Sequence, residues 1–163
     1  MPEDLVKLVD RLKKDREEFW LSKTQWKRSK VPKTLVWNSV IFRRSESTAI
    51  PATRGVYAFQ IKYSSGGIPQ HGYLMYVGET GNRNSQETLR SRFLSYFSEM
   101  QAKERSLHYV LCKYEDYLYF HYSPISDRRR NLKNIEAWLC DTLVPPYNVK
   151  DFSVEMRKAK KAL

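Results

Sequence analysis

Two strand-like segments joined by a glycine-containing turn constrain this chain more than any other feature. Residues 56–62 and 73–77 are rich in β-branched and aromatic side chains, which favour an extended, half-buried backbone. The connection between them contains Ser64-Ser65-Gly66-Gly67, a run of small turn-forming residues. The pattern predicts an antiparallel hairpin.

Helices and a further strand are predicted after the hairpin. A helix over residues 86–100, capped by Asn84 or Ser85, has apolar residues at helical spacing: Leu89, Phe93, Tyr96, Phe97 and Met100. Apolar residues alternate along a strand over 118–122, and residues 109–113 read as an additional strand. A second helix, capped by Ser126 or Asp127, carries Leu132, Ile135, Leu139 and Leu143. The fold class is therefore α/β in the broad sense (α+β), a small antiparallel β-sheet flanked by helices.

The two ends of the chain add a helix, a basic arm and a basic tail. Residues 3–19 predict a helix that packs on the main domain through an apolar stripe of Leu5, Leu8, Val9 and Leu12. Pro32 and Pro51 argue against one continuous helix in the arm that follows. Three parts are expected: residues 1–54 with the helix and arm, 55–148 with the main domain, and 149–163 as a basic tail or short helix.

The arm between residues 23 and 44 contains seven basic residues and no acid, interleaved with Trp26, Trp37 and Phe42. Basic residues mixed with aromatic ones suit a groove that follows phosphates and stacks bases. On this interpretation the arm's nucleic-acid contacts include Lys23, Lys27, Arg28, Lys30, Arg43 and Arg44. The alternative is a solvated arm whose tryptophans anchor it to the core.

Charge favours a nucleic-acid partner. The chain carries 29 Lys and Arg against 18 Asp and Glu, for a formal charge of +11, and such an excess favours polyanions. A membrane surface is disfavoured because no basic amphipathic helix is rich enough to bind one. Neither a signal peptide nor an apolar stretch of about 18 residues is present, so an intracellular (cytoplasmic) protein is expected. Cys112 and Cys140 lie in apolar surroundings and are expected to be reduced core residues.

Glu136 occupies an unusual place for a carboxylate. It stands four residues after Leu132 and three before Leu139, on the apolar stripe of the second predicted helix. An unpaired charge there costs several kcal/mol, on the order of the effective penalty for burying an ion. A divalent cation is one compensation, because Mg²⁺ binds one or two carboxylates together with waters and phosphate oxygens. The alternatives are a salt bridge to Arg90 or Arg92, or escape of the side chain to solvent.

Arg92 and Tyr96 are separated by four residues and therefore share one face of the first predicted helix. A guanidinium group can hold a phosphate through two hydrogen bonds and stabilise the charge that develops in the transition state. Tyr96 either orients the phosphate or packs in the core. Arg90 is a second candidate for phosphate contact or an ordinary surface arginine.

Tyr57 and Tyr76 are predicted on the two strands of the hairpin, where opposed side chains lie within about 5 Å. Both phenols can therefore point into one site. Tyrosine is a poor base because its ordinary pKa is about 10. A nearby cation and arginine would have to favour the phenolate or activate water directly.

These residues belong to an ordered series of motifs: Gly55-Val56-Tyr57, Tyr76-Val77-Gly78, the helical run 89–97, Glu136, and Pro145-Pro146-Tyr147-Asn148. The series resembles the GIY-YIG nuclease domain. Val56 and Val77 stand where the family has isoleucine and preserve the β-branched shape. Glu79 follows the second triplet where some relatives carry lysine, so the resemblance does not extend to lysine-assisted activation at that position.

The resemblance implies a small metal-dependent phosphodiesterase that cuts nucleic acid. It implies Mg²⁺ as the cofactor, with Mn²⁺ able to substitute, and Glu136 as its ligand. It also implies Arg92 on the scissile phosphate, Tyr57 as general base for the attacking water, and Tyr76 assisting by hydrogen bonding.

Two further positions match the series. Tyr96 stands where family members place tyrosine or histidine. Asn148 closes the series and is expected at the nucleic-acid interface.

Three functions are compatible with this sequence. The first is a sequence-specific, restriction-like endonuclease that prefers DNA to RNA, and a homodimer would be expected if it cuts both strands of a symmetric site. The second is a structure-selective repair, recombination or mobile-element nuclease. The third is a nucleic-acid-binding module without catalysis.

Overall fold

The predicted hairpin forms two strands of the sheet. The structure is a computed structural model that describes residues 4–83, 85–102 and 105–162, in which β2 (Gly55–Ser65) and β3 (Ile68–Thr80) pair antiparallel. The turn lies at Gly66-Gly67, and Gly67 has a φ of 81°, which glycine adopts without strain. The predicted hairpin is therefore confirmed.

Two more strands complete a four-stranded antiparallel sheet with the order β1-β4-β2-β3. The predicted strand after residue 117 is present as β4 (Leu118–Pro124), which pairs with β2. The edge strand β1 (Asn38–Ile41) pairs with β4 and was not predicted. Because β1 comes from the basic arm, the arm and the main domain share one sheet.

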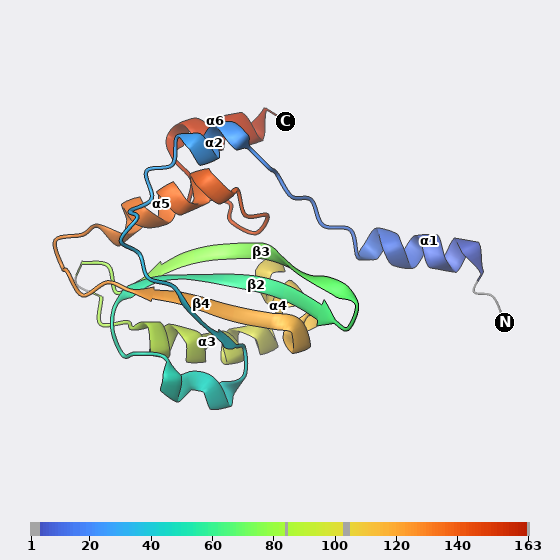
Figure 1. Cartoon of the computed structure of the whole chain (residues 1–163), viewed down its shortest axis with the longest axis horizontal. Coiled ribbons are helices and arrows are strands. Elements are labelled where there is room, and N and C mark those ends of the chain that lie inside the picture. Colours follow the sequence, from blue (N-terminus) through green and yellow to red (C-terminus); the bar gives the residue numbers. More distant parts are fainter. Residues whose placement is uncertain (1–3, 84, 103–104, 163) are drawn as a thin grey trace.

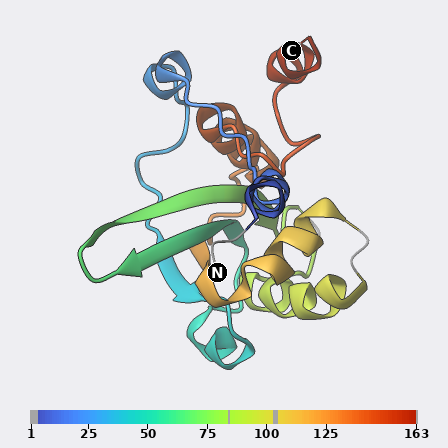
Figure 2. The ribbon, with the colours of Figure 1, turned by 90° about the vertical axis from the view of Figure 1, so that its right-hand side faces the viewer.

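Helices cover both faces of the sheet (Figure 1). One face packs against α3 (Leu89–Ala102) and α4 (Ser106–Lys113), and the other against α5 (Leu132–Leu143). Two short helices, α2 (Lys23–Lys27) and α6 (Val154–Lys161), lie over α5, and Figure 2 shows them end-on at its two sides. Two 3-10 helices, η1 (Arg44–Ala49) and η2 (Glu115–Tyr117), complete the described elements. The α+β architecture agrees with the sequence.

Alternation along β2 sends its side chains into two separate cores. Tyr57 and Phe59 belong to the core under α3, whereas Val56 and Ala58 belong to the core under α5. The motif tyrosines therefore face α3, and the β-branched residue between Gly55 and Tyr57 supports the opposite layer.

Both predicted helix caps are displaced along the chain. The helix α3 begins at Leu89 and is capped by Thr88, whose Oγ1 accepts from the Ser91 N–H at 3.1 Å, so the prediction for Ser85 is wrong. Asn84 lies outside the described residues. The helix α5 is capped by Asn131 rather than by Ser126 or Asp127.

The loop before α5 explains its later start. The Arg54 guanidinium donates to the backbone carbonyls of Asp127 and Arg130, both at 2.9 Å. These two bonds hold residues 127–130 outside the helix. A long-range contact thus overrides two residues with good capping side chains.

Residues 109–113 form part of helix α4, so the additional strand predicted there is wrong. The segment is β-branched and aromatic, but Leu107, Val110 and Leu111 are buried at helical spacing against α3. Tertiary packing outweighs the local strand preference here.

The N-terminal helix α1 (Leu5–Lys14) does not pack on the main domain as predicted. It projects from the body (Figure 1), and Leu5 and Leu12 are 71% and 58% exposed. Its end is attached by Lys113, whose Nζ lies 2.6 Å from Asp15 and donates to the Lys14 carbonyl at 3.1 Å. The extended segment that follows α1 carries the apolar stripe away from the core.

Candidate active site

The side chains of Tyr57, Arg92 and Tyr96 form one hydrogen-bonded network between the sheet and α3. The two phenol oxygens are 2.9 Å apart. Arg92 donates through Nε to Tyr57 at 3.2 Å and through Nη2 to Tyr96 at 3.3 Å, and its guanidinium carbon lies 4.4 Å from the Tyr96 ring centroid. Three residues predicted for the site are therefore in direct contact.

The same arginine is fixed on its other side by acceptors from α3. Its Nη1 donates to Glu99 at 2.7 Å and to the Ser95 hydroxyl at 3.1 Å. Glu99 also lies 3.2 Å from Nε2 of the buried His108 on α4. Burial lowers the pKa of His108, which favours the neutral ring. Glu99 is consequently the carboxylate that balances Arg92.

Tyr57 is closed off from solvent, with 1% of its surface exposed. Its ring stacks on Phe120 and reaches over Gly78 of β3, where an added Cβ would lie only 2.4 Å from the phenol oxygen. Burial raises the pKa of Tyr57 well above its ordinary value, against the lowering effect of Arg92. At neutral pH this phenol is protonated.

Tyr96 combines the two roles that the sequence left open. Its ring is fully buried in the core under α3, while its hydroxyl belongs to the arginine network. Burial raises its pKa as well. The residue packs and hydrogen-bonds at the same time.

Tyr76 extends this network toward the sheet edge. It lies diagonally from Tyr57 across the β2–β3 pair, with ring centroids 6.3 Å apart, because Phe59 rather than Tyr57 is directly opposite it. The guanidinium carbon of Arg105 lies 5.8 Å from its ring, and hydrogen bonding to Tyr76 raises the pKa of Arg105 against the effect of burial. Tyr76 is 7% exposed and is thus nearer to solvent than Tyr57.

Two carboxylates, Glu136 and Asp151, act on Tyr76 at the outer edge of β3, and Glu79 of β3 acts on Glu136. Burial raises the pKa of Glu136 on α5 to about 8, and the charges of Asp151 and Glu79 raise it further. Both Glu136 and Asp151 raise the pKa of Tyr76 electrostatically, after the larger effect of its burial. Neither Arg90 nor Arg92 pairs with Glu136, so the alternative of a salt bridge to either arginine is not realised among the described residues.

The segment after α5 pairs with the free edge of β3. The Asn148 side chain accepts from the Val77 N–H at 2.9 Å and donates to the Val77 carbonyl at 2.8 Å, and the Tyr147 N–H donates to the Met75 carbonyl. Asn148 also donates to Asp151 at 2.9 Å and is buried. Its side chain therefore pairs with the backbone of the edge strand and orients Asp151.

The residues at this edge fit a divalent cation. The negative charges of Asp151 and Glu79 act on Glu136, and one oxygen of Glu79 is buried without a hydrogen-bond partner among the described residues. A bound cation would offset the negative charge around Glu136 and give the unpaired oxygen of Glu79 a partner. No group of three His, Cys, Asp or Glu side chains within the described ranges forms a ready-made cluster. Mg²⁺ does not require one, because it takes most of its ligands from water and phosphate.

The predicted nucleic-acid-binding residues do not form one surface. On α2, Lys23 and Lys27 lie over α5, whereas Arg44 lies 5.3 Å from the Phe97 ring of α3, on the other face of the sheet. Arg28 and Lys30 follow α2, and Arg43 precedes η1. These side chains are exposed.

Arg90 stabilises the fold by hydrogen bonding to backbone carbonyls. It donates through Nε to the Ile50 carbonyl at 2.7 Å and through Nη2 to the Thr48 carbonyl at 3.4 Å. These bonds attach η1 to α3. Arg90 is therefore neither a free surface arginine nor a partner of Glu136.

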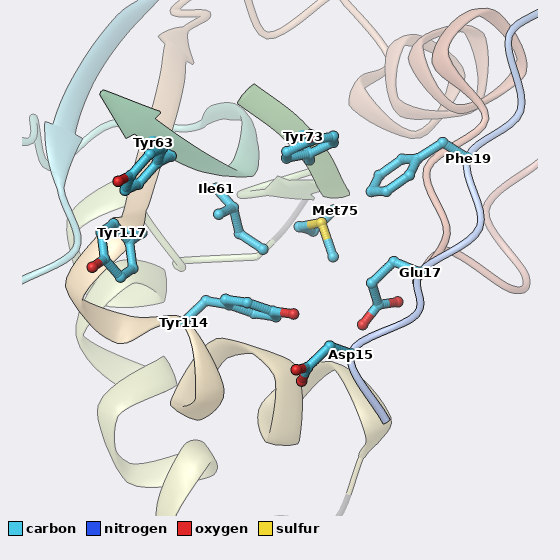
Figure 3. Close-up of a pocket in the computed structure, with 9 residues that line it drawn as sticks. All are labelled: Asp15, Glu17, Phe19, Ile61, Tyr63, Tyr73, Met75, Tyr114 and Tyr117. Atoms are coloured by element: carbon cyan, nitrogen blue, oxygen red, sulfur yellow. The ribbon is translucent and has the colours of Figure 1, made fainter. Parts of the chain in front are cut away.

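A cavity of about 560 Å³ lies at the far end of the hairpin, away from these residues (Figure 3). Its walls are mainly aromatic and include Tyr63, Tyr73 and Tyr114, with the carboxylates of Asp15 and Glu17 at one side. An apolar, acidic lining disfavours phosphate. The cavity is therefore distinct from the candidate nuclease site.

Sequence reasoning missed three site residues: Glu99, Arg105 and Asp151. The spacing of Glu99 from Arg92 is seven residues, or two helical turns, which is a usable signal for a pair on one face. Turns of the chain bring Arg105 and Asp151 to the site, and no local sequence pattern indicates either residue.

No protein-family model, curated protein or solved structure matches this chain. None of the described helices combines the length and apolar character of a membrane span. The functional assignment rests on the residues and their geometry.

Proposed function

We propose that this protein is a metal-dependent endonuclease of the GIY-YIG type that hydrolyses DNA phosphodiester bonds inside the cell. The observation that carries the proposal is the convergence of the motif residues on Tyr76. Its ring lies 6.3 Å from that of Tyr57 in the Arg92 network, and the charge of Glu136 adds a smaller contribution to the burial that raises its pKa. The formal charge of +11 supports a polyanionic substrate.

Arg92 is the residue that binds the scissile phosphate. Its Nη2 makes one long hydrogen bond, to Tyr96 at 3.3 Å, which leaves the second N–H of that group for a phosphate oxygen. The side chain is 18% exposed and can be reached from solvent. Fixed by Glu99 and the two phenols, it needs no reorganisation to stabilise the charge of the transition state.

Glu136 is the residue that would hold the cation, with Asp151 and Glu79 contributing negative charge around it. Bound Mg²⁺ supplies Lewis acidity and lowers the pKa of a coordinated water. Because the pKa of Glu136 is about 8, its carboxyl is largely protonated at neutral pH, and cation binding releases that proton. The affinity for Mg²⁺ should therefore rise with pH up to about 8.

The two motif tyrosines have different tasks in this proposal. Tyr57 is buried and protonated, so it positions Arg92 rather than removing a proton from water. Tyr76 is nearer to the carboxylates and orients water or phosphate by hydrogen bonding. This division changes the general-base role that the family resemblance implies for Tyr57.

A nucleic-acid-binding module without catalysis is the second candidate. The observation that favours it is the raised pKa of both Tyr57 and Tyr76, which leaves no phenolate at neutral pH. Binding would then persist without Mg²⁺, and no cleavage would occur.

Cleavage assays test the proposal. Supercoiled plasmid, a labelled branched duplex and a labelled RNA are incubated with and without Mg²⁺, and with Mn²⁺, using the wild type and Glu136→Ala. Discrete metal-dependent DNA products that disappear in the variant are expected. A palindromic cut site together with a dimer would indicate a restriction-like enzyme, and preference for the branched duplex a structure-selective one. Full activity of Glu136→Ala would contradict the assignment.

A further inference from the structure

The C-terminal helix α6 and the segment before it carry a cluster of basic residues outside the arm. Five basic residues follow Asn148 in the described chain, against two acids, Asp151 and Glu155. Arg157, Lys158 and Lys161 are exposed, and Lys161 lies four residues after Arg157 and three after Lys158, so it neighbours both of them on the helix surface. None of them pairs with a carboxylate in the part of the chain that the structure describes.

These side chains line a groove of about 740 Å³ between α6 and the segment 146–150. One wall carries Lys150 and Asn148, and the other carries the basic face of α6. No acidic side chain lines it among the described residues. Glu155 instead lines a second cleft, between α6, α5 and the end of α2, so the one acid of α6 faces away from the basic groove.

The groove has fixed walls and is not the surface of a loose tail. The start of α6 is tied to α5, because the Ser153 N–H donates to Asp141 at 3.0 Å. Its last turn is tied to the opposite wall by Lys160, whose Nζ donates to the Asn148 carbonyl at 3.4 Å and lies 4.3 Å from the Phe152 ring centroid. Burial lowers the pKa of Lys160, in agreement with this supporting role.

Like charges spaced by three and four residues destabilise a helix unless counter-ions neutralise them. The unpaired cations of α6 therefore favour an anionic occupant. Phosphates in regular succession match these cations, which lie between Arg157 and Lys161 and so span about 6 Å along the helix axis. One strand of a B-form duplex places a phosphate every ~3.4 Å along its axis, so a few phosphates fit this length.

The groove adjoins the candidate active site. Asn148 lies in its wall and donates to Asp151, and the charge of Asp151 raises the pKa of Glu136. Two side chains thus connect the basic groove to the proposed cation ligand. A polyanion bound along α6 would therefore extend toward Glu136.

We propose that this groove binds the phosphate backbone of the nucleic-acid substrate through Arg157, Lys158 and Lys161 and directs the strand to Glu136. The proposal rests on the proposed nuclease function for its choice of polyanion. It assigns the main phosphate contact to α6, whereas the sequence pointed to the arm at residues 23–44.

Fluorescence anisotropy in EDTA tests the groove without cleavage. A labelled duplex and a labelled single strand are titrated with the wild type and with the triple variant R157Q/K158Q/K161Q. The matched control is K7Q/K13Q/K14Q, which removes the same charge from exposed residues of α1. We expect the α6 variant to lose about 10- to 100-fold in affinity and the slope of log affinity against log salt to fall by about 2 to 3. The control should lose less than about threefold.

Three results would contradict the proposed groove. The first is an equal loss of affinity in the α6 and α1 variants, which would mean that only net charge matters. The second is wild-type affinity in the α6 variant. The third is binding of anionic vesicles in place of either nucleic acid. Circular dichroism melts of all three proteins establish that they are folded.

Parallel reactions in Mg²⁺ separate this proposal from the nuclease assignment. If binding depends on α6 but the wild type never cleaves, the nuclease assignment is contradicted and phosphate binding by the groove is supported. If the wild type cleaves and the α6 variant cleaves with an unchanged KM, phosphate binding by the groove is contradicted and the nuclease assignment is supported.

Discussion

The network around Arg92 and the carboxylates around Glu136 both reach Tyr76, but their charges are compensated differently. In the network, Arg92 meets Glu99 at 2.7 Å and two phenol oxygens within 3.3 Å. At the edge of β3, the charges of Asp151 and Glu79 add to the burial that raises the pKa of Glu136, and only a backbone hydrogen bond from Glu79 and the charge of the exposed Lys133 are found to lower it among the described residues.

The difference separates residues that stabilise the fold from residues that we propose bind a cation. A closed network with balanced charge stabilises the protein, and removing one member leaves the others unsatisfied. An excess of carboxylates costs stability until a cation arrives. Four substitutions can break or sharpen this contrast.

The largest effect is expected from Arg92→Ala. It removes the proposed phosphate-binding group and leaves Glu99, Tyr57 and Tyr96 without their common donor. Plasmid cleavage should fall at least ~100-fold, and urea denaturation should show a loss of about 1 to 3 kcal/mol in the free energy of unfolding. Arg128→Ala, at an exposed arginine, is the control and should change stability by less than about 0.5 kcal/mol. Unchanged stability in Arg92→Ala would show that the network does not support the fold.

Gly78→Ala should disrupt the network without removing any of its polar groups. The new Cβ would meet the Tyr57 ring, which cannot retreat because it packs against Phe120. We expect a loss of about 1 to 3 kcal/mol in the free energy of unfolding, measured by thermal or urea denaturation. Gly66→Ala is the matched control, since nothing lies within 4 Å of a Cβ at that position. Equal effects of the two substitutions would contradict the account of Tyr57.

Glu136→Gln should behave in the opposite sense and stabilise the protein as the pH rises. The folded wild type keeps a proton on Glu136 up to about pH 8, whereas the unfolded chain releases it near the ordinary pKa of about 4.5. Wild-type stability therefore falls between these two pH values, and that of the glutamine variant does not. In EDTA the variant should be more stable than the wild type above pH 8, by roughly 1.4 kcal/mol for each pH unit between the unfolded and folded pKa values, and equally stable below pH 4.5.

Urea denaturation at a series of pH values measures this difference. Glu155→Gln, at an exposed glutamate of α6, serves as the control. A constant difference between the Glu136 variant and the wild type at every pH would show that Glu136 titrates normally.

The smallest effect is expected from Arg105→Ala. Arg105 is exposed, and its interaction with Tyr76 lies between the two clusters. Stability should change by less than about 0.5 kcal/mol, and kcat for cleavage should fall by less than about tenfold while KM rises. A fall in kcat as large as that caused by Arg92→Ala would show that Arg105 contributes to cleavage as directly as Arg92.

The fold could be predicted where local and long-range preferences agree. The hairpin could be predicted from the composition of residues 56–62 and of the Gly66-Gly67 turn. The edge strand β1 was missed because it has four residues, two of them the exposed Asn38 and Ser39, and forms only by pairing with β4. The helix α4 was misread because its residues prefer a strand until they pack on α3.

The candidate site could be predicted in part for a similar reason. The spacing of Arg92 and Tyr96 places them on one helical face, and the structure joins them in one network. The spacing of Glu136 within α5 indicated a carboxylate beside the core, and burial raises its pKa as that position suggests. The contributions of Arg105 and Asp151 depend on where turns bring the chain, and the partners of Arg54 and Arg90 are backbone carbonyls that sequence patterns do not reveal.

The most direct test of the contrast is the change in melting temperature on adding Mg²⁺ at pH 8, measured for the wild type and Glu136→Gln in the same buffer. Ligand binding to the folded state raises the melting temperature. The account predicts a rise in the wild type that increases with Mg²⁺ concentration and is lost in the variant. An equal shift in both proteins, or no shift in the wild type at millimolar Mg²⁺, would contradict a cation site at Glu136.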